Sequence, residues 1–324
     1  MSKQTIAHGR GHKPASAPCL SSLPRAFFAR TSGAGWALRL AVVVALSGIV
    51  LLFCMVGLFA LPLFTGNAEN AGVFTGQWLP AQGKFGIMPM LCATLLLAFS
   101  ALLLALPLAF GICARLYLGE KQHSPSLLTR LLRICINAMT AVPTVVYGFA
   151  ALFLLTPLVR AGLGGTGLCW LSAALLLALL ALPTMVLVIE AGLRPRMEAL
   201  RHTAAALGFA PVQAWLFLGL PAAKHALLAA AVLGFGRAAG DTLLPLMLSG
   251  NAPQFVLDPS ASLRALSAHM ALVTANEAGS SAYNSLFAAG ALLLLFNAGI
   301  SLLARALSRP VQSARQQQNA EHQA

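Results

Sequence analysis

The sequence predicts an all-α polytopic membrane protein with six transmembrane helices. Of its 324 residues, 58% are hydrophobic and only 9% are charged, whereas a soluble domain carries about 25% charged residues. Soluble globular proteins therefore do not fit, and disordered chains are excluded because they are poor in apolar residues. A bilayer-spanning helix needs about 20 mostly apolar residues. Six stretches meet that length: residues 37–63, 88–114, 134–158, 167–189, 226–249 and 286–304.

The first span, 37–63, follows a basic segment and therefore resembles a secretory signal at first sight. Its apolar run is much longer than the usual 7–15 or so residues of a signal peptide, and no small-residue cleavage site follows it. We therefore expect a retained helix. The organisation that follows is an N-terminal tail over 1–36, a six-helix domain over 37–304 and a C-terminal tail over 305–324, with both tails polar and mobile.

The orientation of the spans follows from the positions of the basic residues. Of the 21 Lys and Arg residues, 17 lie in the two tails and in the second and fourth connections, counting Arg39 at the start of the first span with the N-terminal tail, and three lie in the other connections. The remaining one, Arg237, lies inside the fifth span. This asymmetry predicts that both termini and the even connections are cytoplasmic. Topology at the lipid surface thus explains the net charge of +13, and no nucleic-acid partner is needed.

The sequence indicates no metal or nucleotide site. Its six cysteines form no C-x-x-C pair, and its seven histidines show no ligand spacing beside them. The cysteines are expected to be small buried side chains, mostly within spans. The phosphate-cradling pattern G-x-x-x-x-G-K-[ST] is absent. We therefore expect no cofactor in this chain, and any ATP that drives it to be bound by a partner subunit.

The fourth connection, residues 190–225, is the first feature that bears on function. A helix-forming run over 197–207 ends at Gly208, and an amphipathic stretch over 212–220 ends at Pro221. This order predicts a short two-helix unit along the membrane surface. A solvated linker is the simpler interpretation, but it would leave large apolar side chains in water without a reason. A docking surface for a cytoplasmic partner explains these side chains better: Trp215, Leu216, Phe217, Leu218 and Leu220.

The same connection resembles the cytoplasmic motif of binding-protein-dependent ABC importer permeases. That motif reads Glu-Ala-Ala, three residues, Gly, nine residues, a hydrophobe, any residue, Leu and Pro. In that family it forms the coupling helices that sit in a groove of the ATPase subunit. His202 stands where the family has Glu, and Thr203 stands where it has the first Ala. With every spacing preserved, the matching residues are His202, Thr203, Ala204, Gly208, Leu218, Leu220 and Pro221.

Two ionisable residues in the fifth span are the second feature that bears on function. Arg237 lies about 17 Å along a helix from Ala226, at 1.5 Å per residue, near the midplane of a ~30 Å hydrocarbon core. Asp241 follows four residues later, on the same helix face, where the two can pair. A central Arg or Asp costs about 2.5–3.5 kcal/mol, so each needs a partner or a polar cavity. The pair either locks helices together or lines a polar pathway for an anion.

The residues around this pair resemble the fifth-span signature of phosphate ABC importer permeases. Residues 237–242 read Arg-Ala-Ala-Gly-Asp-Thr, and 247–253 read Met-Leu-Ser-Gly-Asn-Ala-Pro. The family has Arg-Ala-any-Gly-Glu-Thr followed by Met-any-any-Gly-Asn-Ala-Pro, so Asp241 is one methylene shorter than its counterpart. Two further stretches agree, Phe-Gly-Ile-Met-Pro at 85–89 and Ala-Val-Pro-Thr-Val-Val-Tyr-Gly at 141–148. The resemblance covers about residues 76–255 and is nearer to the PstC-type than to the PstA-type subunit.

This resemblance implies a MetI-like permease architecture in the cytoplasmic (inner) membrane. It further implies a second permease subunit as a heterodimeric partner, two ATP-binding cassette subunits, and a periplasmic or extracellular solute-binding protein. The implied solute is inorganic phosphate, with Arg237, Asp241 and Thr242 along its path. From the residues alone, the solute is only a small anion.

Three alternatives remain. The nearest is a permease for another small anion or solute in the same superfamily. A polytopic membrane enzyme is less well supported, since the sequence has no Ser/His/Asp set, paired carboxylates or metal spacing at a membrane face. A passive channel would not require a docking surface for a motor. The chain itself is therefore not expected to be an enzyme.

Overall fold

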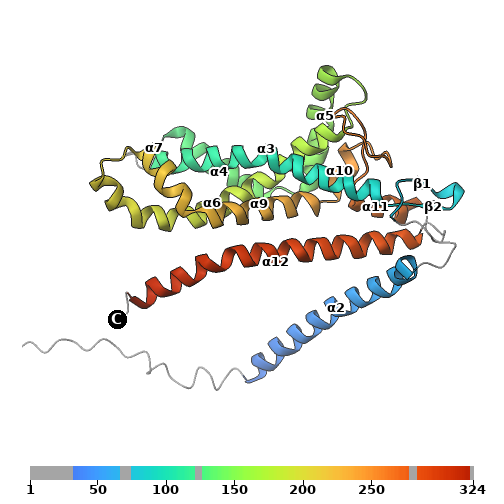
Figure 1. The fold of residues 1–324 in the computed structure, drawn as a ribbon, viewed down its shortest axis with the longest axis horizontal. Helices are drawn as coiled ribbons and strands as arrows, with labels where there is room; N and C mark the ends of the chain where they lie inside the picture. Colours follow the sequence, from blue (N-terminus) through green and yellow to red (C-terminus); the bar gives the residue numbers. More distant parts are fainter. Residues whose placement is uncertain (1–31, 66–73, 121–125, 277–282, 322–324) are drawn as a thin grey trace, which may run out of the picture. The chain divides into compact units, whose positions relative to one another are not determined.

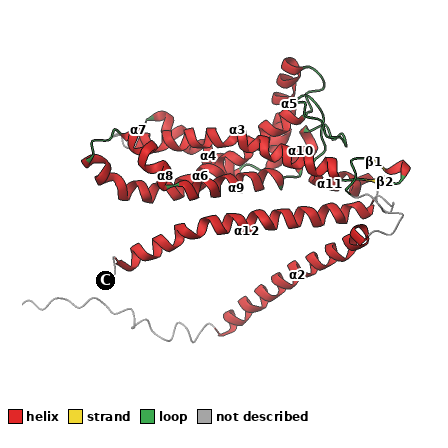
Figure 2. Cartoon of the chain, viewed as in Figure 1, coloured by secondary structure: helices red, strands yellow, loops and turns green. Residues whose placement is uncertain are grey.

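The structure, a computed structural model, describes residues 32–65, 74–120, 126–276 and 283–321 and is almost entirely helical (Figure 2). Five of its helices are long and apolar enough to cross a membrane, and a sixth crossing results if one bent helix pair is counted as a single span. The predicted all-α fold with six spans is thereby confirmed. The predicted N-terminal tail lies almost wholly outside the described residues. The chain divides into two units at residue 54, within α2 (Ser32–Thr65), which is the first spanning helix.

The core of the second unit is formed by three helices that lie side by side in Figure 1: α3 (Met88–Glu120), α6 (Trp170–Ala206) and α9 (Lys224–Ala239). Small residues line their contacts, and alanines make up much of the buried core. A Cβ on Gly192 would lie 2.3 Å from the Ala226 side chain, and one on Gly234 would lie 2.6 Å from the Met185 sulfur. Glycine at these two positions therefore allows α6 and α9 to approach each other closely.

The predicted third span is wrong at its start. The structure has two helices there, α4 (Leu127–Ala141) and α5 (Thr144–Leu163), separated at Val142 and Pro143. Proline lacks an amide hydrogen and disfavours helical geometry in the residue before it, which accounts for the break. Of the two helices, only α5 has the length and apolarity of a span.

The predicted boundaries of the fourth and fifth spans also differ from the structure. Helix α6 does not end near residue 189 but continues to Ala206, so the first part of the 190–225 connection is an extension of the span. The predicted fifth span is divided into α9 and α10 (Leu243–Leu248), with a break at residues 240–242.

The end of the second unit near α10 carries a small cap, built from a hairpin and a short helix. Strands β1 (Trp78–Leu79) and β2 (Lys84–Phe85) pair through Trp78 and Phe85, joined by η2 (Pro80–Gln82). Helix α11 (Leu266–Asn276) packs below them, with the fully buried His269 edge-on to Trp78 at 4.3 Å between ring centroids. Burial, together with the nearby Arg264, lowers the His269 pKa to about 4, so this imidazole is neutral at pH 7. The cap is therefore held by the packing of Trp78 on a buried, neutral imidazole.

The last helix, α12 (Tyr283–Glu321), runs through the predicted C-terminal tail rather than ending before it. Its first half packs against α9 and α11. Near its start, Phe287 stacks on Phe59 with ring centroids 4.8 Å apart. The first half of α12 is thus part of the helical bundle, and this half lines the cavities described below.

Candidate functional site

Gly208 forms a tight helix end at the far end of α6. It has a φ of +70°, and its amide donates to the Ala205 carbonyl, while the Phe209 amide reaches back to the Ala204 carbonyl at 3.0 Å. These two bonds make a Schellman motif, in which glycine is favoured at the left-handed position. Ala204 and Phe209 pack in the same cluster, the apolar contact that usually accompanies this motif. The predicted break at Gly208 is confirmed.

The second predicted helix of the connection is present, but it does not end at Pro221. It comprises α7 (Pro211–Gln213), the π-helical turn η3 (Ala214–Gly219) and α8 (Leu220–Ala222), which leads directly into α9. Trp215 is buried and packs edge-to-face on Phe110 of α3, with ring centroids 4.4 Å apart. Leu218 packs against the same cluster. Trp215 thus anchors the segment to the bundle and is unavailable as a docking residue.

Several other apolar side chains of the 190–225 connection are exposed on the surface of the structure. We call this set the docking surface; its large members are between 42% and 66% exposed, which is unusual for so many neighbouring hydrophobes. His202 and Thr203 are also exposed on the last turns of α6, next to the glycine break. The docking surface consists of Leu207, Val212, Leu216 and Phe217.

The docking surface is joined to α9 by a sharp elbow. The segment 211–222 and α9 meet at an angle of 73°. At the elbow, the Ala223 amide donates to the carbonyls of both Gly219 and Leu220, and the Arg196 guanidinium on α6 donates to the Ala222 carbonyl. The elbow is therefore held by main-chain hydrogen bonds and by one side chain from the neighbouring helix.

The other end of α9 carries Arg237 in its last turn, and the helix ends at Ala239. Asp241 lies beyond that end, so the prediction that both residues share one helix face is wrong. Pro245 has no amide hydrogen to donate to the Asp241 carbonyl, so the hydrogen-bond ladder of α9 does not continue through this position. The two residues form no ion pair within the described part of the chain.

Asp241 instead stabilises the start of α10. Its carboxylate accepts a hydrogen bond from the Leu244 amide at 2.9 Å, and its carbonyl accepts one from the Ser267 hydroxyl at 2.9 Å. A carboxylate is well suited to capping the free amides at a helix start. Thr242 follows at the N-cap position, and its carbonyl accepts from the Leu246 amide. Asp241 thus fixes the break and ties it to α11.

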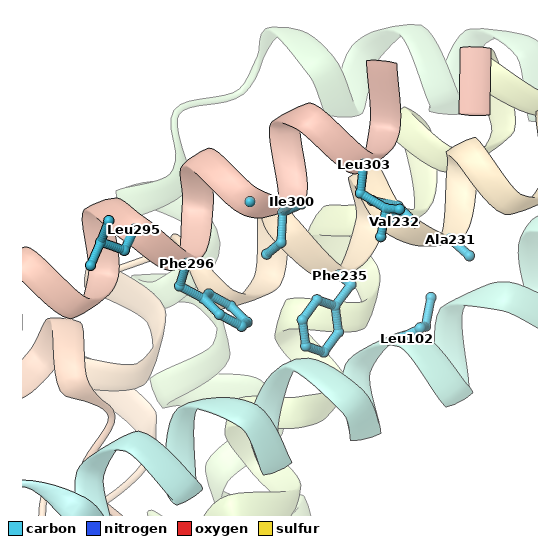
Figure 3. Close-up of a pocket in the computed structure, with 9 residues that line it drawn as sticks. Leu102, Ala231, Val232, Phe235, Leu295, Phe296, Ile300 and Leu303 are labelled. Carbon is cyan, nitrogen blue, oxygen red and sulfur yellow. The ribbon is translucent and has the colours of Figure 1, made fainter. Parts of the chain in front are cut away.

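Two cavities lie along the contact between α9 and α12. The apolar cavity, of about 560 Å³, is lined by α3, α9 and α12 (Figure 3). Phe235 and Phe296 point into it and pack edge-to-face at 5.9 Å between ring centroids. Its wall carries no polar side chain: Leu102, Ala231, Val232, Phe235, Leu295, Phe296, Gly299, Ile300 and Leu303.

The second, polar cavity has a volume of about 280 Å³ and contains Arg237. It is walled by α6, α9 and α12, and four of its seven lining residues are polar. Thr184, Asn297 and Ser301 stand beside Arg237, and Leu233, Gly236 and Ile300 complete the wall. Sequence reasoning missed the three neutral polar residues, although each interrupts an otherwise apolar span. Asp241 is not in the wall of this cavity.

A further charged residue that sequence reasoning missed lies deeper along α6. Glu190 forms an ion pair with Arg133 of α4, with 3.1 Å between the guanidinium nitrogen and the carboxylate oxygen. Glu190 is about one-quarter exposed, so a charge at this depth of a spanning helix needs its partner. The pair fastens the amphipathic α4 to the bundle.

Comparison with known proteins identifies the family of this chain. Residues 108–313 match the family model described as binding-protein-dependent transport system inner membrane component. The chain belongs to this family. It is therefore an ABC importer permease, a multi-pass protein of the inner membrane.

Relatives by sequence cover most of this permease. A phosphate transport system permease protein PstC of Haemophilus influenzae is 26% identical over 297 residues, 82% of this chain and 91% of the relative. The PstC of Mesorhizobium japonicum is 24% identical over 79% of this chain and 85% of its own length. The probable ABC transporter permease protein YqgH of Bacillus subtilis is 29% identical over 72% of this chain and 75% of the relative.

Solved structures share the fold of the permease. A chain of the MetNI methionine ABC transporter, in an inward-facing conformation, aligns with a TM-score of 0.55 at 18% identity, covering 72% of this chain and 99% of that chain. The predicted permease architecture is thereby confirmed.

Proposed function

We propose that this permease carries inorganic phosphate across the cytoplasmic membrane. The main support is the similarity to PstC phosphate permeases, which extends over 82% of the chain in the Haemophilus influenzae protein. The polar cavity adds a physical argument, since it offers an Arg guanidinium in a span that is otherwise apolar. Guanidinium groups match the oxygens of phosphate in geometry and charge.

Three residues lie along the proposed phosphate path and have different roles: Arg237, Asp241 and Thr242. Arg237 contacts the anion from the last turn of α9. Asp241 and Thr242 stabilise the break in the backbone between α9 and α10: Asp241 accepts from the Leu244 amide, and Thr242 is the N-cap of α10. Irregular backbone at membrane depth is tolerated where it lines a cavity, as it would along a solute path.

The docking surface is proposed to contact an ATP-binding cassette subunit. Leu207 and Phe217, 64% and 66% exposed, would insert into a groove of that subunit. His202, Thr203, Gly208 and Pro221 would surround the contact, while Ala204, Leu218 and Leu220 are at least partly buried and would shape it from beneath. ATP binding and hydrolysis would then take place in that partner.

The complete transporter would contain this chain, a second permease, two ATP-binding cassette subunits and a solute-binding protein. Both termini and the docking surface would be cytoplasmic, as the distribution of basic residues predicts. The cap with the β1–β2 hairpin would face the binding protein. The MetNI neighbours, at 18–19% identity, bear on fold alone and do not favour methionine as the solute.

Uptake of radiolabelled phosphate tests the solute. The complete importer, reconstituted in vesicles loaded with ATP, should accumulate phosphate when its binding protein is added, and should not accumulate sulfate or methionine. Accumulation of one of those solutes in place of phosphate would refute the proposal.

Cysteine labelling tests the orientation. In a cysteine-free background, Ser260→Cys should react with an impermeant thiol reagent added from outside intact cells, because residue 260 is exposed beyond α10. Ala205→Cys, exposed beside Gly208, is the matched control and should react only after the membrane is opened. The reverse pattern would invert the topology.

A further inference from the structure

Three neutral polar side chains surround Arg237 in the polar cavity, and no function is assigned to them above. Thr184 comes from α6, and Asn297 and Ser301 come from α12. Within the described residues, no hydrogen-bond partner is found for the side chains of Arg237, Thr184 or Ser301. Arg237 and Ser301 are exposed and Thr184 is half-buried, so their donor groups are free to bind a polar ligand.

The orientation of Asn297 is fixed by its own helix. Its amide nitrogen donates to the Leu293 carbonyl at 3.0 Å. A carbonyl oxygen can only accept, so the amide nitrogen must face it. The amide oxygen is thus the end of Asn297 that stays available, and it lies near Gly240, 3.5 Å from the place of an added Cβ. Asn297 presents an uncharged acceptor next to a cationic donor.

This combination distinguishes between oxyanions. The guanidinium of Arg237 and the two hydroxyls can donate to the oxygens of any tetrahedral oxyanion. An amide oxygen can only accept, so it is stabilised by an anion that carries an O–H group and repelled by one that carries none. At neutral pH phosphate retains a proton, whereas sulfate does not.

We propose that Asn297, with Ser301 and Thr184, completes the anion site around Arg237, and that the Asn297 amide oxygen accepts a hydrogen bond from the protonated oxygen of the anion. This inference rests on the proposed function and adds the specificity-determining residue to it. A carboxylate at this place would neutralise Arg237. The Asn297 amide can accept a hydrogen bond from the O–H group of the anion and leaves the positive charge of Arg237 to bind that anion. The Asp241 carboxylate is not available for this part, since it caps α10.

The dimensions of the cavity agree with this assignment. A volume of about 280 Å³ corresponds to roughly nine water molecules at ~30 Å³ each, enough for a tetrahedral oxyanion and some of its hydration.

The test uses the complete importer in vesicles with Asn297→Leu, which keeps the branching and the number of side-chain heavy atoms but has no acceptor. Phosphate uptake should fall about tenfold or more, as expected when a buried polar contact to the solute is lost. Asn137→Leu on α4 makes the same chemical change outside the cavity and should leave uptake unchanged. Copurification of the ATPase subunits shows that the variant assembles.

Titration of inorganic phosphate and of sulfate into nanodisc-embedded importer without binding protein gives a second readout. The wild type should bind phosphate about tenfold more tightly than sulfate, and Asn297→Leu should reduce that preference to about twofold. Asn297→Asp, polar and isosteric, serves if the leucine variant fails to assemble, and should bind phosphate more weakly because its charge pairs with Arg237.

The outcomes separate this inference from the proposed function. If the wild type takes up phosphate but Asn297→Leu and Asn297→Asp keep wild-type uptake and preference, the inference is wrong and the proposed function stands. If the wild type takes up no phosphate, both are wrong.

Discussion

The two cavities along α9 and α12 share Ile300 yet differ in their side chains, because only one of them includes polar residues. Ile300 lines both, the apolar cavity lies on the side of Phe235 and Phe296, and the polar cavity lies on the side of Arg237 and Asn297. Apolar walls are stable in a bilayer without any partner. Polar walls are not, because each unpaired group costs free energy there. The contrast indicates that the polar side is retained for a purpose other than packing.

The largest expected effect concerns the charge on the polar side. Arg237→Gln should reduce phosphate uptake to background while the complex still assembles, because it removes the cation among the described residues that line this cavity. Phe235→Leu, two residues away on the apolar side, should change uptake less than about twofold, since it replaces one hydrophobe with another. Uptake measured in the same vesicles checks both. Equal losses in the two variants would remove the functional distinction between the cavities.

Asp241 should show an intermediate effect that depends on hydrogen bonding and not on charge. Asp241→Asn keeps an oxygen that can accept from the Leu244 amide and should retain most uptake. Asp241→Ala loses the cap, at a cost of about 0.5–2 kcal/mol, and should reduce uptake several-fold. Thermal unfolding and uptake are the measurements.

The double variant Arg237→Gln with Asp241→Asn supplies the control for this prediction. If the two charges were a scaffolding pair, each single variant would lose assembly and the double variant would recover normal transport. Since the structure has no such ion pair, we expect the double variant to resemble Arg237→Gln.

Gly208, just after the end of α6, tests the docking surface through backbone conformation alone. Nothing lies within 4 Å of an added Cβ there, so only the positive φ matters. Gly208→Val should reduce coupled ATP hydrolysis strongly, at a strain cost of about 1–2 kcal/mol, whereas Gly208→Asn should be tolerated because Asn adopts this conformation readily. ATPase assays of assembled importer decide. Similar activity of both variants would mean that this helix end does not shape the docking surface.

Two glycines on the shared wall give the smallest expected effect. Gly299 faces the apolar cavity and has open space around it, so Gly299→Ala should raise stability by about 0.5–1 kcal/mol through helix propensity. Gly236→Ala should lower it, because the new methyl group would lie 2.8 Å from the Ile300 side chain. Melting temperatures of the purified protein test the pair. Stabilisation by both changes would show that the polar side is loosely packed.

The sequence predicted the number of spans and the landmarks of the docking region, because length, apolarity and a helix-ending glycine are local signals. It did not predict the breaks at Val142–Pro143 and at Gly240, since a proline or glycine is tolerated in many spans and tertiary packing decides whether the helix stops there. Arg237 was found because a charge in a span is conspicuous. Asn297 and Ser301 were missed because their position beside Arg237 depends on how α12 packs on α9.

The elbow before α9 has a mechanical consequence. Its hydrogen bonds from Ala223 to Gly219 and Leu220 join the docking segment to the residue before α9, and Arg196 joins the elbow to α6. Arg237 lies 13 residues beyond Lys224, about 20 Å along this arm, so a tilt of ~10° at the elbow would shift the guanidinium by roughly 3–4 Å. A shift of this size is similar to the donor–acceptor distance of a hydrogen bond, about 3 Å. Under the proposed function, an ATPase subunit that tilts the docking segment would therefore add or withdraw one anion contact per cycle without unfolding a helix.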